Sequence, residues 1–239
     1  MVLVPAFSFF FPLVGVDEAV RQKLSVATSL AATIPTSLLG ARAHWRHGVV
    51  DVAFVRGLAA PILIGSAIGS VLAVWLGGET LSLIFAALAF ATALLLGLAG
   101  PGFRLSERFP ERSVAAAIGV ALGLVAALMG IGGGTVGVPV MVMFGVPILR
   151  VVGAASVFGL VIAVPGTAVV MAAPPHPAMP PFSLGYVSLP ALAVIVPFAM
   201  LATGAGARFA HRLNQGLLRR GFAVLLVVVA ARMAATALG

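Results

Sequence analysis

Long apolar runs without a charged side chain alternate with short charged clusters along this chain. The uncharged runs cover residues 24–41, 57–78, 80–103, 113–149, 151–207 and 221–231. A helix needs about 20 residues to cross the ~30 Å hydrocarbon core of a bilayer, and several of these runs are that long. The pattern predicts an all-α, polytopic membrane protein.

The limits of the hydrophobic segments follow from the same pattern. We expect about seven to eight such segments, some of them broken into shorter pieces. They fall at about 1–16, 24–41, 57–76, 81–99, 113–129 with 135–145 as the two pieces of one broken segment, 151–171, 184–207 and 217–237.

A glycine cluster, Gly130-Ile131-Gly132-Gly133-Gly134, interrupts the run 113–149. Each glycine weakens a helix by about 1 kcal/mol, and lipid tolerates broken backbone only where protein shields it or where it lines a cavity. We therefore predict a re-entrant hairpin bent at these glycines. A new helix should begin at 135, with Thr135 at its N-cap, and the exposed N–H groups at a helix start bind anions. The alternative is that the glycines only allow close helix packing.

The two halves of the chain resemble each other. Val4-Pro5 followed by Gly15 is similar to Val138-Pro139 followed by Gly145. Further along, a constant shift of 137 residues relates Gly48 to Gly185, Gly69 to Gly206 and Phe85 to Phe222. This indicates an internal duplication. We expect a first transmembrane repeat at 1–99, a cytoplasmic linker at 100–112 and a second repeat at 113–239.

Arginine distribution predicts the orientation of the repeats, because cytoplasmic loops are enriched in Lys and Arg. The segments 42–56, 100–112 and 208–220 are arginine-rich, and we place them inside together with Arg150. The 172–184 loop has no charged residue, so we place it outside with the 77–80 turn. Equivalent loops of the two halves then lie on opposite faces. This is typical of inverted-topology repeats, whose substrate site lies near the midplane.

Hydroxyl groups near the repeated Val-Pro elements are candidate anion ligands, because a hydroxyl can donate without burying a charge. The full set of candidate substrate-binding residues is Thr28, Ser29, Gly132, Gly133, Gly134, Thr135 and Ser156. Each hydroxyl could instead bond to a carbonyl of its own helix. Arg42, His44 and Arg46 could form a cytoplasmic vestibule for anions or, alternatively, an interfacial anchor around Trp45.

Composition excludes several classes of protein. The chain is 62% hydrophobic and 8% charged, too apolar for a soluble domain of 239 residues. Its formal charge of +8 is carried by arginines beside the apolar runs, which fits membrane topology and gives no support for nucleic-acid binding. Cysteine is absent. No Asp or Glu lies inside an expected span, which disfavours a carboxylate proton relay. We expect no catalytic residue, metal or cofactor.

Several of these motifs together resemble a known family. Gly130-Ile131-Gly132-Gly133-Gly134, Val138-Pro139, Gly145 and Ala154-Ala155-Ser156 resemble the second repeat of the TauE/SafE sulfite exporters, and Val4-Pro5, Ala27-Thr28-Ser29-Leu30 and His44-Trp45-Arg46-His47-Gly48 resemble the first. The resemblance implies export of sulfite or a small organosulfonate across the inner membrane. The sequence departs from the family pattern in two ways. Its first repeat begins at Val4-Pro5, without the opening helix and glycine cluster, and Ala155 stands where the family often has Thr.

The functional hypothesis is therefore an exporter of a small anion, embedded in the lipid bilayer and driven by the membrane potential or an ion gradient. Transport of a different small anion stays open, as does a non-transporting membrane subunit that scaffolds a partner. An intramembrane enzyme would need a pair such as Ser29 and His44, which lie about four helical turns apart. A homodimer is a further expectation.

Overall fold

The computed structural model describes residues 2–98, 105–106, 109–210 and 215–238. The first half contains α1 (Leu3–Phe10), the 3₁₀ helix η1 (Phe11–Val14), α2 (Glu18–Arg46), α3 (Val52–Trp75) and α4 (Gly78–Leu98). The second half contains α5 (Arg112–Leu128), α6 (Gly134–Met143), α7 (Ile148–Ala172), β1 (Ser183–Leu184), β2 (Val187–Ser188), α8 (Leu189–Ala210) and α9 (Gln215–Leu238). The predicted all-α membrane fold is confirmed.

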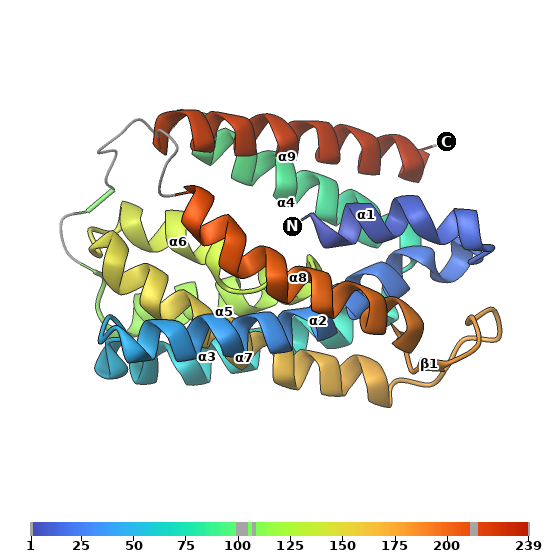
Figure 1. The fold of residues 1–239 in the computed structure, drawn as a ribbon, viewed down its shortest axis with the longest axis horizontal. Coiled ribbons are helices and arrows are strands. Elements are labelled where there is room, and N and C mark those ends of the chain that lie inside the picture. The colour runs from blue at the N-terminus through green and yellow to red at the C-terminus, as the bar shows by residue number, and fades with distance from the viewer. Residues whose placement is uncertain (1, 99–104, 107–108, 211–214, 239) are drawn as a thin grey trace.

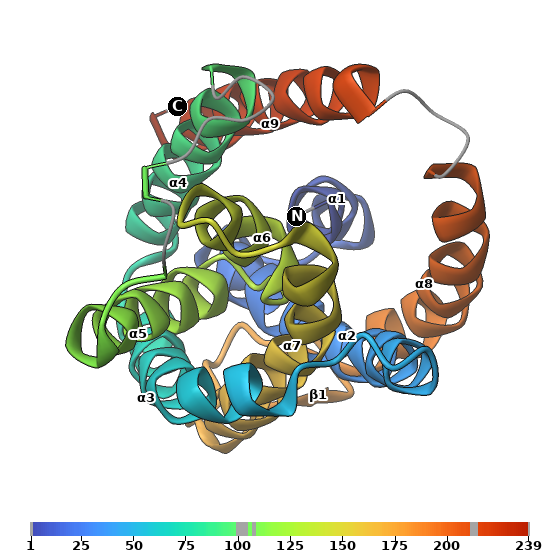
Figure 2. The ribbon, with the colours of Figure 1, turned by 90° about the vertical axis from the view of Figure 1, so that its left-hand side faces the viewer.

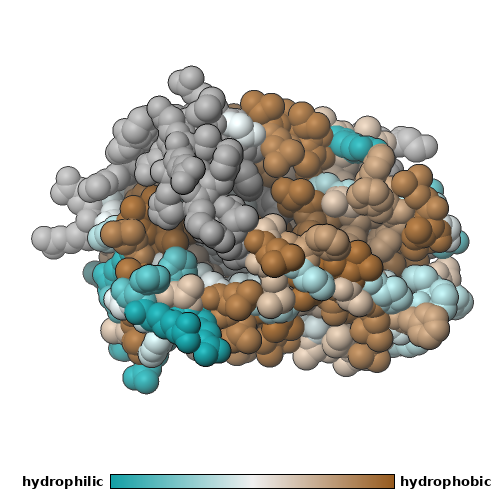
Figure 3. All heavy atoms as spheres, in the orientation of Figure 1, coloured by the Kyte–Doolittle hydropathy of each residue, from teal (hydrophilic) through white to brown (hydrophobic). Residues whose placement is uncertain are grey.

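Length and composition qualify four of the described helices to cross a bilayer: α2, α3, α4 and α7. The remaining described helices include shorter apolar ones. The axes of the described helices run roughly along one direction (Figure 1). On the face in Figure 3, hydrophobic side chains cover the middle, and the most hydrophilic ones gather at one end of the bundle. That distribution suits a protein surrounded by lipid.

Antiparallel packing of α2 against α7 forms the centre of the bundle. A side chain on Gly40, near the end of α2, would meet Ser156 near the start of α7. Conversely, Leu30 near the middle of α2 faces Gly166 near the end of α7. The two helices therefore run in opposite directions. In the end view, α6 lies inside the bundle while α4, α8 and α9 lie around the outside (Figure 2).

Small residues bring α3 and α5 into direct backbone contact. A side chain on Gly65 would collide with the Val120 carbonyl, and one on Gly123 would collide with the Ile62 carbonyl. Lipid tails are as apolar as leucine, so close van der Waals packing through small residues drives helix association in membranes. Gly65 and Gly123 thus allow close helix packing, which is the role considered above as the alternative for the glycines at 130–134.

Contacts between distant segments define the two ends of the bundle. At one end, the Leu105 N–H donates to the Met143 carbonyl at 2.7 Å, and Arg150 pairs with Asp51 at 2.6 Å. At the other end, the Tyr186 N–H donates to the Val170 carbonyl at 3.0 Å. Residues 42–56, 105–106, 109–112 and 150, which belong to the segments placed inside, thus share one end. Residues 100–104, 107–108 and 211–214 of the expected inside loops lie outside the described residues.

Both ends of the segment 113–149 therefore lie at the same end of the bundle, so the chain enters and returns as expected of a re-entrant hairpin. The two halves also share a local geometry. Gly15 and Gly145 have φ of 77° and 75°. Each closes the preceding helix, and the next residue donates to a carbonyl five positions earlier, Val16 to Phe11 and Val146 to Met141. This is the glycine-terminated Schellman motif. The division into repeats at 1–99 and 113–239 remains a prediction, supported by this likeness.

The start of the expected span 184–207 was wrong. The expected span 184–207 begins at Leu189, because Ser183–Leu184 and Val187–Ser188 pair as a short antiparallel hairpin. Gly185 turns the chain with φ +55°, and a side chain there would collide with the Val170 carbonyl. An apolar run does not reveal such a tight turn, because strand and helix segments of this length have the same hydrophobicity.

Candidate functional site

The break between α5 and α6 is built by a glycine that ends α5. Gly130 has φ +60°, its N–H donates to Ala127, and the Ile131 N–H donates to Ala126. These two bonds complete a Schellman motif. Any side chain on Gly130 would lie 2.6 Å from the Val26 carbonyl of α2. Left-handed backbone and close approach to α2 therefore both require glycine at this position.

The next residues leave backbone donors free at the start of α6. Gly133 is the N-cap of α6, without a side-chain capping bond, and the first recorded bond into this turn runs from the Gly137 N–H to the Gly133 carbonyl. The N–H groups of residues 132–136 form no hydrogen bond with another described residue. Thr135 is inside α6 and is not its N-cap, so that expectation was wrong. The cause is that helical backbone begins before Thr135, since Gly133 already has φ −60° and ψ −13°.

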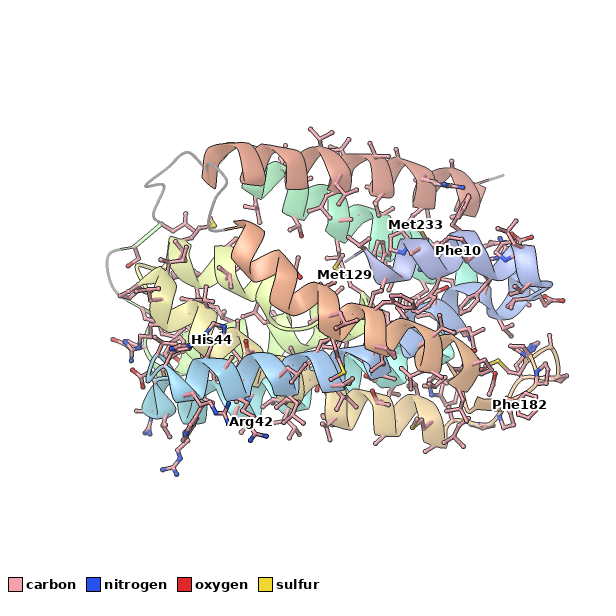
Figure 4. All side chains as sticks on the ribbon, in the orientation of Figure 1. Phe10, Arg42, His44, Met129, Phe182 and Met233 are labelled. Carbon is pink, nitrogen blue, oxygen red and sulfur yellow. The ribbon has the colours of Figure 1, made fainter. Side chains whose placement is uncertain are left out.

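Helices α2 and α7 form the walls around the break. A side chain on Gly132 would meet Thr33 of α2 at 3.0 Å, and one on Gly133 would meet Phe158 of α7 at 2.9 Å. Gly134 has more room, with the Ala155 methyl 3.7 Å from the equivalent position. Between them, the three glycines are therefore close to both central helices. Met129, just before the break, lies near the middle of the bundle (Figure 4).

Three hydroxyls near the break make no recorded hydrogen bond. Ser156 of α7 lies against Gly40 of α2. Ser37 of α2 lies against Gly159 of α7 and 3.8 Å from the position a side chain on Gly132 would take. Thr135 stands in the first turn of α6. All three are partly buried. Sequence reasoning missed Ser37, because only the packing of α2 on α7 brings it to the break.

The other two predicted hydroxyls hold the structure together. Ser29 is buried and donates to the Gly130 carbonyl at 2.7 Å, which ties α2 to the break. Thr28 is also buried and accepts from the Ser188 N–H at 3.1 Å, which ties α2 to the β hairpin. The structure thus brings Ser29 to the break and directs Thr28 towards the hairpin. A role for either in binding substrate stays a prediction.

The proposed vestibule residues lie in the last turns of α2. Arg42 and Arg46 are exposed, and His44 is partly buried. Arg42 and His44 extend from opposite sides of α2 (Figure 4). These three residues do not form one cluster. They lie at the end of the bundle that also holds the ion pair between Asp51 and Arg150.

No group of three or more His, Cys, Asp or Glu side chains is arranged to hold a metal within the described residues. Two cavities of about 540 and 490 Å³ lie among α1, α2, α4 and α9, and no residue of the glycine break lines either one. The break is packed against α2 and α7.

Comparison with known proteins identifies the family. The model of the family described as sulfite exporter TauE/SafE matches residues 1–233. The chain belongs to this family. A probable membrane transporter protein of Haemophilus influenzae (strain ATCC 51907 / DSM 11121 / KW20 / Rd) is 29% identical over 236 residues, which cover 98% of this chain and 89% of that protein. No solved structure matches.

This TauE/SafE protein is accordingly a membrane transporter and not an enzyme. Its substrate is a small molecule, and its helices lie in a lipid bilayer. In this transporter, unpaired amide donors, hydroxyl groups and a break in the backbone lie together between two central helices of the described structure.

Proposed function

We propose that this protein exports sulfite or a small organosulfonate across the cytoplasmic membrane. The observation that carries the proposal is the set of N–H groups at residues 132–136 that have no partner among the described residues, flanked by hydroxyls and, in that part of the chain, by no acidic side chain. A helix start carries partial positive charge and stabilises anions. Such donors match the oxygen atoms of a sulfite or sulfonate group.

In this proposal, Gly132, Gly133, Gly134 and Thr135 contribute backbone N–H groups to the anion. Hydroxyl groups of Thr135, Ser156 and Ser37 complete the shell, because they are near the break and bind nothing else. Ser29 keeps the break in position through Gly130. Arg42, His44 and Arg46 act at the cytoplasmic end, where they raise the local concentration of the anion.

The membrane potential supplies the driving force. A negative interior expels an anion with about 2.3 kcal/mol per charge per 100 mV. The uncharged runs contain no carboxylate for a proton relay, which supports transport without such a relay. In proteoliposomes loaded with sulfite, we expect efflux to rise when valinomycin and a potassium gradient make the interior negative. Efflux that is independent of the imposed potential would contradict this coupling.

Two hydroxyl variants test the site directly. Ser37→Ala and Ser156→Ala each remove a donor that holds no structural bond. A hydrogen bond to a charged group contributes about 1.5–3 kcal/mol, so we expect the KM for sulfite to rise about ten-fold or more. Thr36→Val is the matched control. The neighbouring Thr36 hydroxyl bonds only to the Ala32 and Thr33 carbonyls of its own helix, so its loss should leave KM unchanged.

Alanine substitutions at Gly133, before α6, and at Gly137, within it, test the break. In Gly133→Ala the new methyl group would lie 2.9 Å from Phe158 Cβ and must displace the break, whereas in Gly137→Ala it would meet nothing within 4 Å. We expect the first variant to lose most sulfite flux and the second to retain it, with both proteins folded by circular dichroism. Normal transport by a folded Gly133→Ala protein would contradict the site.

Two further outcomes distinguish the alternatives. Flux of another small anion with the same sensitivity to Ser37→Ala would keep the site and change the substrate. Absence of flux for every anion, together with a stable complex after mild extraction, would favour a scaffold subunit.

A further inference from the structure

Lys23 is the only lysine of the chain, and it lies beside the only tyrosine, at the end of the bundle opposite Arg150. Its Nζ donates to the Val74 carbonyl of α3 at 2.7 Å and lies 5.6 Å from the centre of the Tyr186 ring. An ammonium group has three N–H donors, and the carbonyl occupies one of them. Among the described residues, no carboxylate pairs with Lys23. Lys23 therefore offers a positive charge and two further donors at the end that we place outside.

Two buried hydroxyls, one on α3 and one on α7, have no hydrogen-bond partner. Ser70 of α3 is 1% exposed and Thr167 of α7 is 4% exposed. A side chain on Gly166 would meet the Ser70 Oγ at 2.7 Å, so Ser70 lies against the turn of α7 that carries Thr167. Hydroxyls within helices commonly bond to a carbonyl of the preceding turn, as those of Thr36 and Thr92 do. Ser70 and Thr167 make no such bond, and their hydroxyls are left to donate to a ligand.

The two hydroxyls lie between the glycine break and the lysine along the bundle. On α7, Ile162 is at the break, with its Cδ1 3.3 Å from the position that a side chain on Gly133 would take. Thr167 lies about 8 Å further along α7 towards the outer end, at 1.5 Å per residue. On α3, Ser70 is one helical turn before Val74, whose carbonyl accepts from the lysine ammonium. The helices α2 and α3, which carry the lysine and Ser70, both pack on α7 (Figure 2).

The distance from the break to the outer end requires a second set of donors for an anion. On α2, Thr33 lies at the break, and Lys23 is about 15 Å further out, at 1.5 Å per residue. The core between these positions contains the apolar cluster around Ala27. Movement of an anion through an apolar interior without hydrogen bonds is strongly unfavourable. Ser70 and Thr167 supply donors within this interval.

We propose that Ser70, Thr167 and Lys23 form the outward path of the exported anion. The two hydroxyls bind the anion after it leaves the glycine break, and Lys23 binds it at the outer end. The ligand is the sulfite or sulfonate of the proposed function, on which this inference rests. Lysine suits this position because its ammonium is strongly hydrated and stands on a flexible stem, so it can follow an anion into water. Both hydroxyls are closed to solvent in this structure, where Leu30 and Ser70 meet at Gly166.

Uptake of radioactive sulfite into membrane vesicles of defined orientation tests the path from each side. Right-side-out vesicles report the KM at the outer face, and inside-out vesicles report the KM at the cytoplasmic face. We expect Lys23→Gln to raise the outer KM about ten-fold, since it removes a charged donor, and to leave the cytoplasmic KM unchanged. Lys23→Arg preserves the charge and should keep the outer KM within about three-fold of wild type. Arg21→Gln is the matched control, because this neighbouring arginine pairs with Glu18, and both KM values should stay unchanged.

Ser70→Ala and Thr167→Val test the two hydroxyls. We expect each variant to lower the maximal uptake rate about five-fold in both kinds of vesicle, because a hydrogen bond along the path is lost. Neither variant should lower Tm, since the hydroxyl that is removed has no partner in the described structure. Ser66→Ala is the matched control. Its hydroxyl, one turn earlier on α3, donates to the Leu63 carbonyl, so its loss should keep the wild-type rate.

Three results would overturn this inference while sulfite transport itself stands. These are an unchanged outer KM in Lys23→Gln, an equal rise of the outer KM in Arg21→Gln, and wild-type uptake rates in both Ser70→Ala and Thr167→Val. A KM that rises at both faces in Ser37→Ala but at neither face in Lys23→Gln would keep the glycine break as the site and remove the outward path. Absence of sulfite and organosulfonate uptake by the wild type would instead contradict the proposed function, and the outward path with it.

Discussion

Among the described residues, the hydrogen bond from Ser29 to Gly130 is the only side-chain bond that ties α2 to the glycine break, and its loss can be tested with Ser29→Ala. The bond is 2.7 Å long and buried, and it joins positions 101 residues apart. The Gly130 carbonyl has no other recorded partner among the described residues. Removal of the hydroxyl therefore leaves a buried acceptor unsatisfied, which costs about 1–3 kcal/mol in general.

Interhelical hydrogen bonds in membranes are weaker than that range on average. Measured values average about 0.6 kcal/mol and reach about 1.7 kcal/mol. The Ser29 bond is short and shielded from lipid, and its acceptor lies where regular helical bonding has stopped. We therefore expect a loss near the upper value, about 1.5 kcal/mol, which corresponds to a more than ten-fold change in the unfolding equilibrium.

Titration with sodium dodecyl sulfate in mixed micelles, followed by circular dichroism, measures this difference. Ser66→Ala is the matched control, because Ser66 is fully buried but donates only to the Leu63 carbonyl of its own helix. Its loss should change the free energy of unfolding by less than about 0.5 kcal/mol. If Ser29→Ala is no less stable than Ser66→Ala, the bond does not hold the break, and the explanation given for Ser29 is wrong.

Three further predictions concern stability. Gly130→Ala should destabilise the protein by at least about 1–2 kcal/mol in the same titration, because an alanine resists φ +60° and would press against α2; equal stability would contradict the geometry. Gly123→Val should separate α3 from α5 and lower Tm by several degrees, since its side chain would collide with the Ile62 carbonyl. The Phe54 N–H and then Arg150 hold the pKa of Asp51 below its ordinary value of 3.8. The stabilising effect of the Asp51 carboxylate is thus present above pH 3.8 and is lost as the pH falls below that value. Between pH 7 and pH 3, the Tm of Asp51→Asn should therefore fall by less than the Tm of the wild type.

Local sequence predicted the break because its cause is local. A run of glycines stops a helix whatever surrounds it, so the position of the bend at 130–134 could be read directly. The same reasoning explains why the matching helix ends at Gly15 and Gly145 were visible as a repeated pattern. Thr135 was misplaced as a cap because Thr is a preferred N-cap residue, whereas the backbone is already helical at Gly133, two residues earlier.

The roles of individual hydroxyls could not be read from sequence, because each depends on which helix lies opposite. Thr28 and Ser29 are adjacent, yet one bonds to residue 188 and the other to residue 130. Ser37 has no local feature that distinguishes it from Thr36. It reaches the break because Gly159 of α7 leaves space for it. Such pairings join positions more than 100 residues apart, and only the packed structure defines them.

The arrangement of these pairings bears on how an anion would pass. The donors of the break belong to α6, but α2 and α7 close it from two sides, and they run antiparallel. The Ser29 bond fixes α2 to the break, whereas the described contacts of Gly133 and Gly134 with α7 are van der Waals contacts with Phe158 and Ala155. Separation from α7 therefore breaks no recorded hydrogen bond at the break, while separation from α2 breaks one. We infer that α7 moves and that α2 stays with the break when the proposed site opens. Ser37 on α2 would then remain at the site, whereas Ser156 on α7 would leave it.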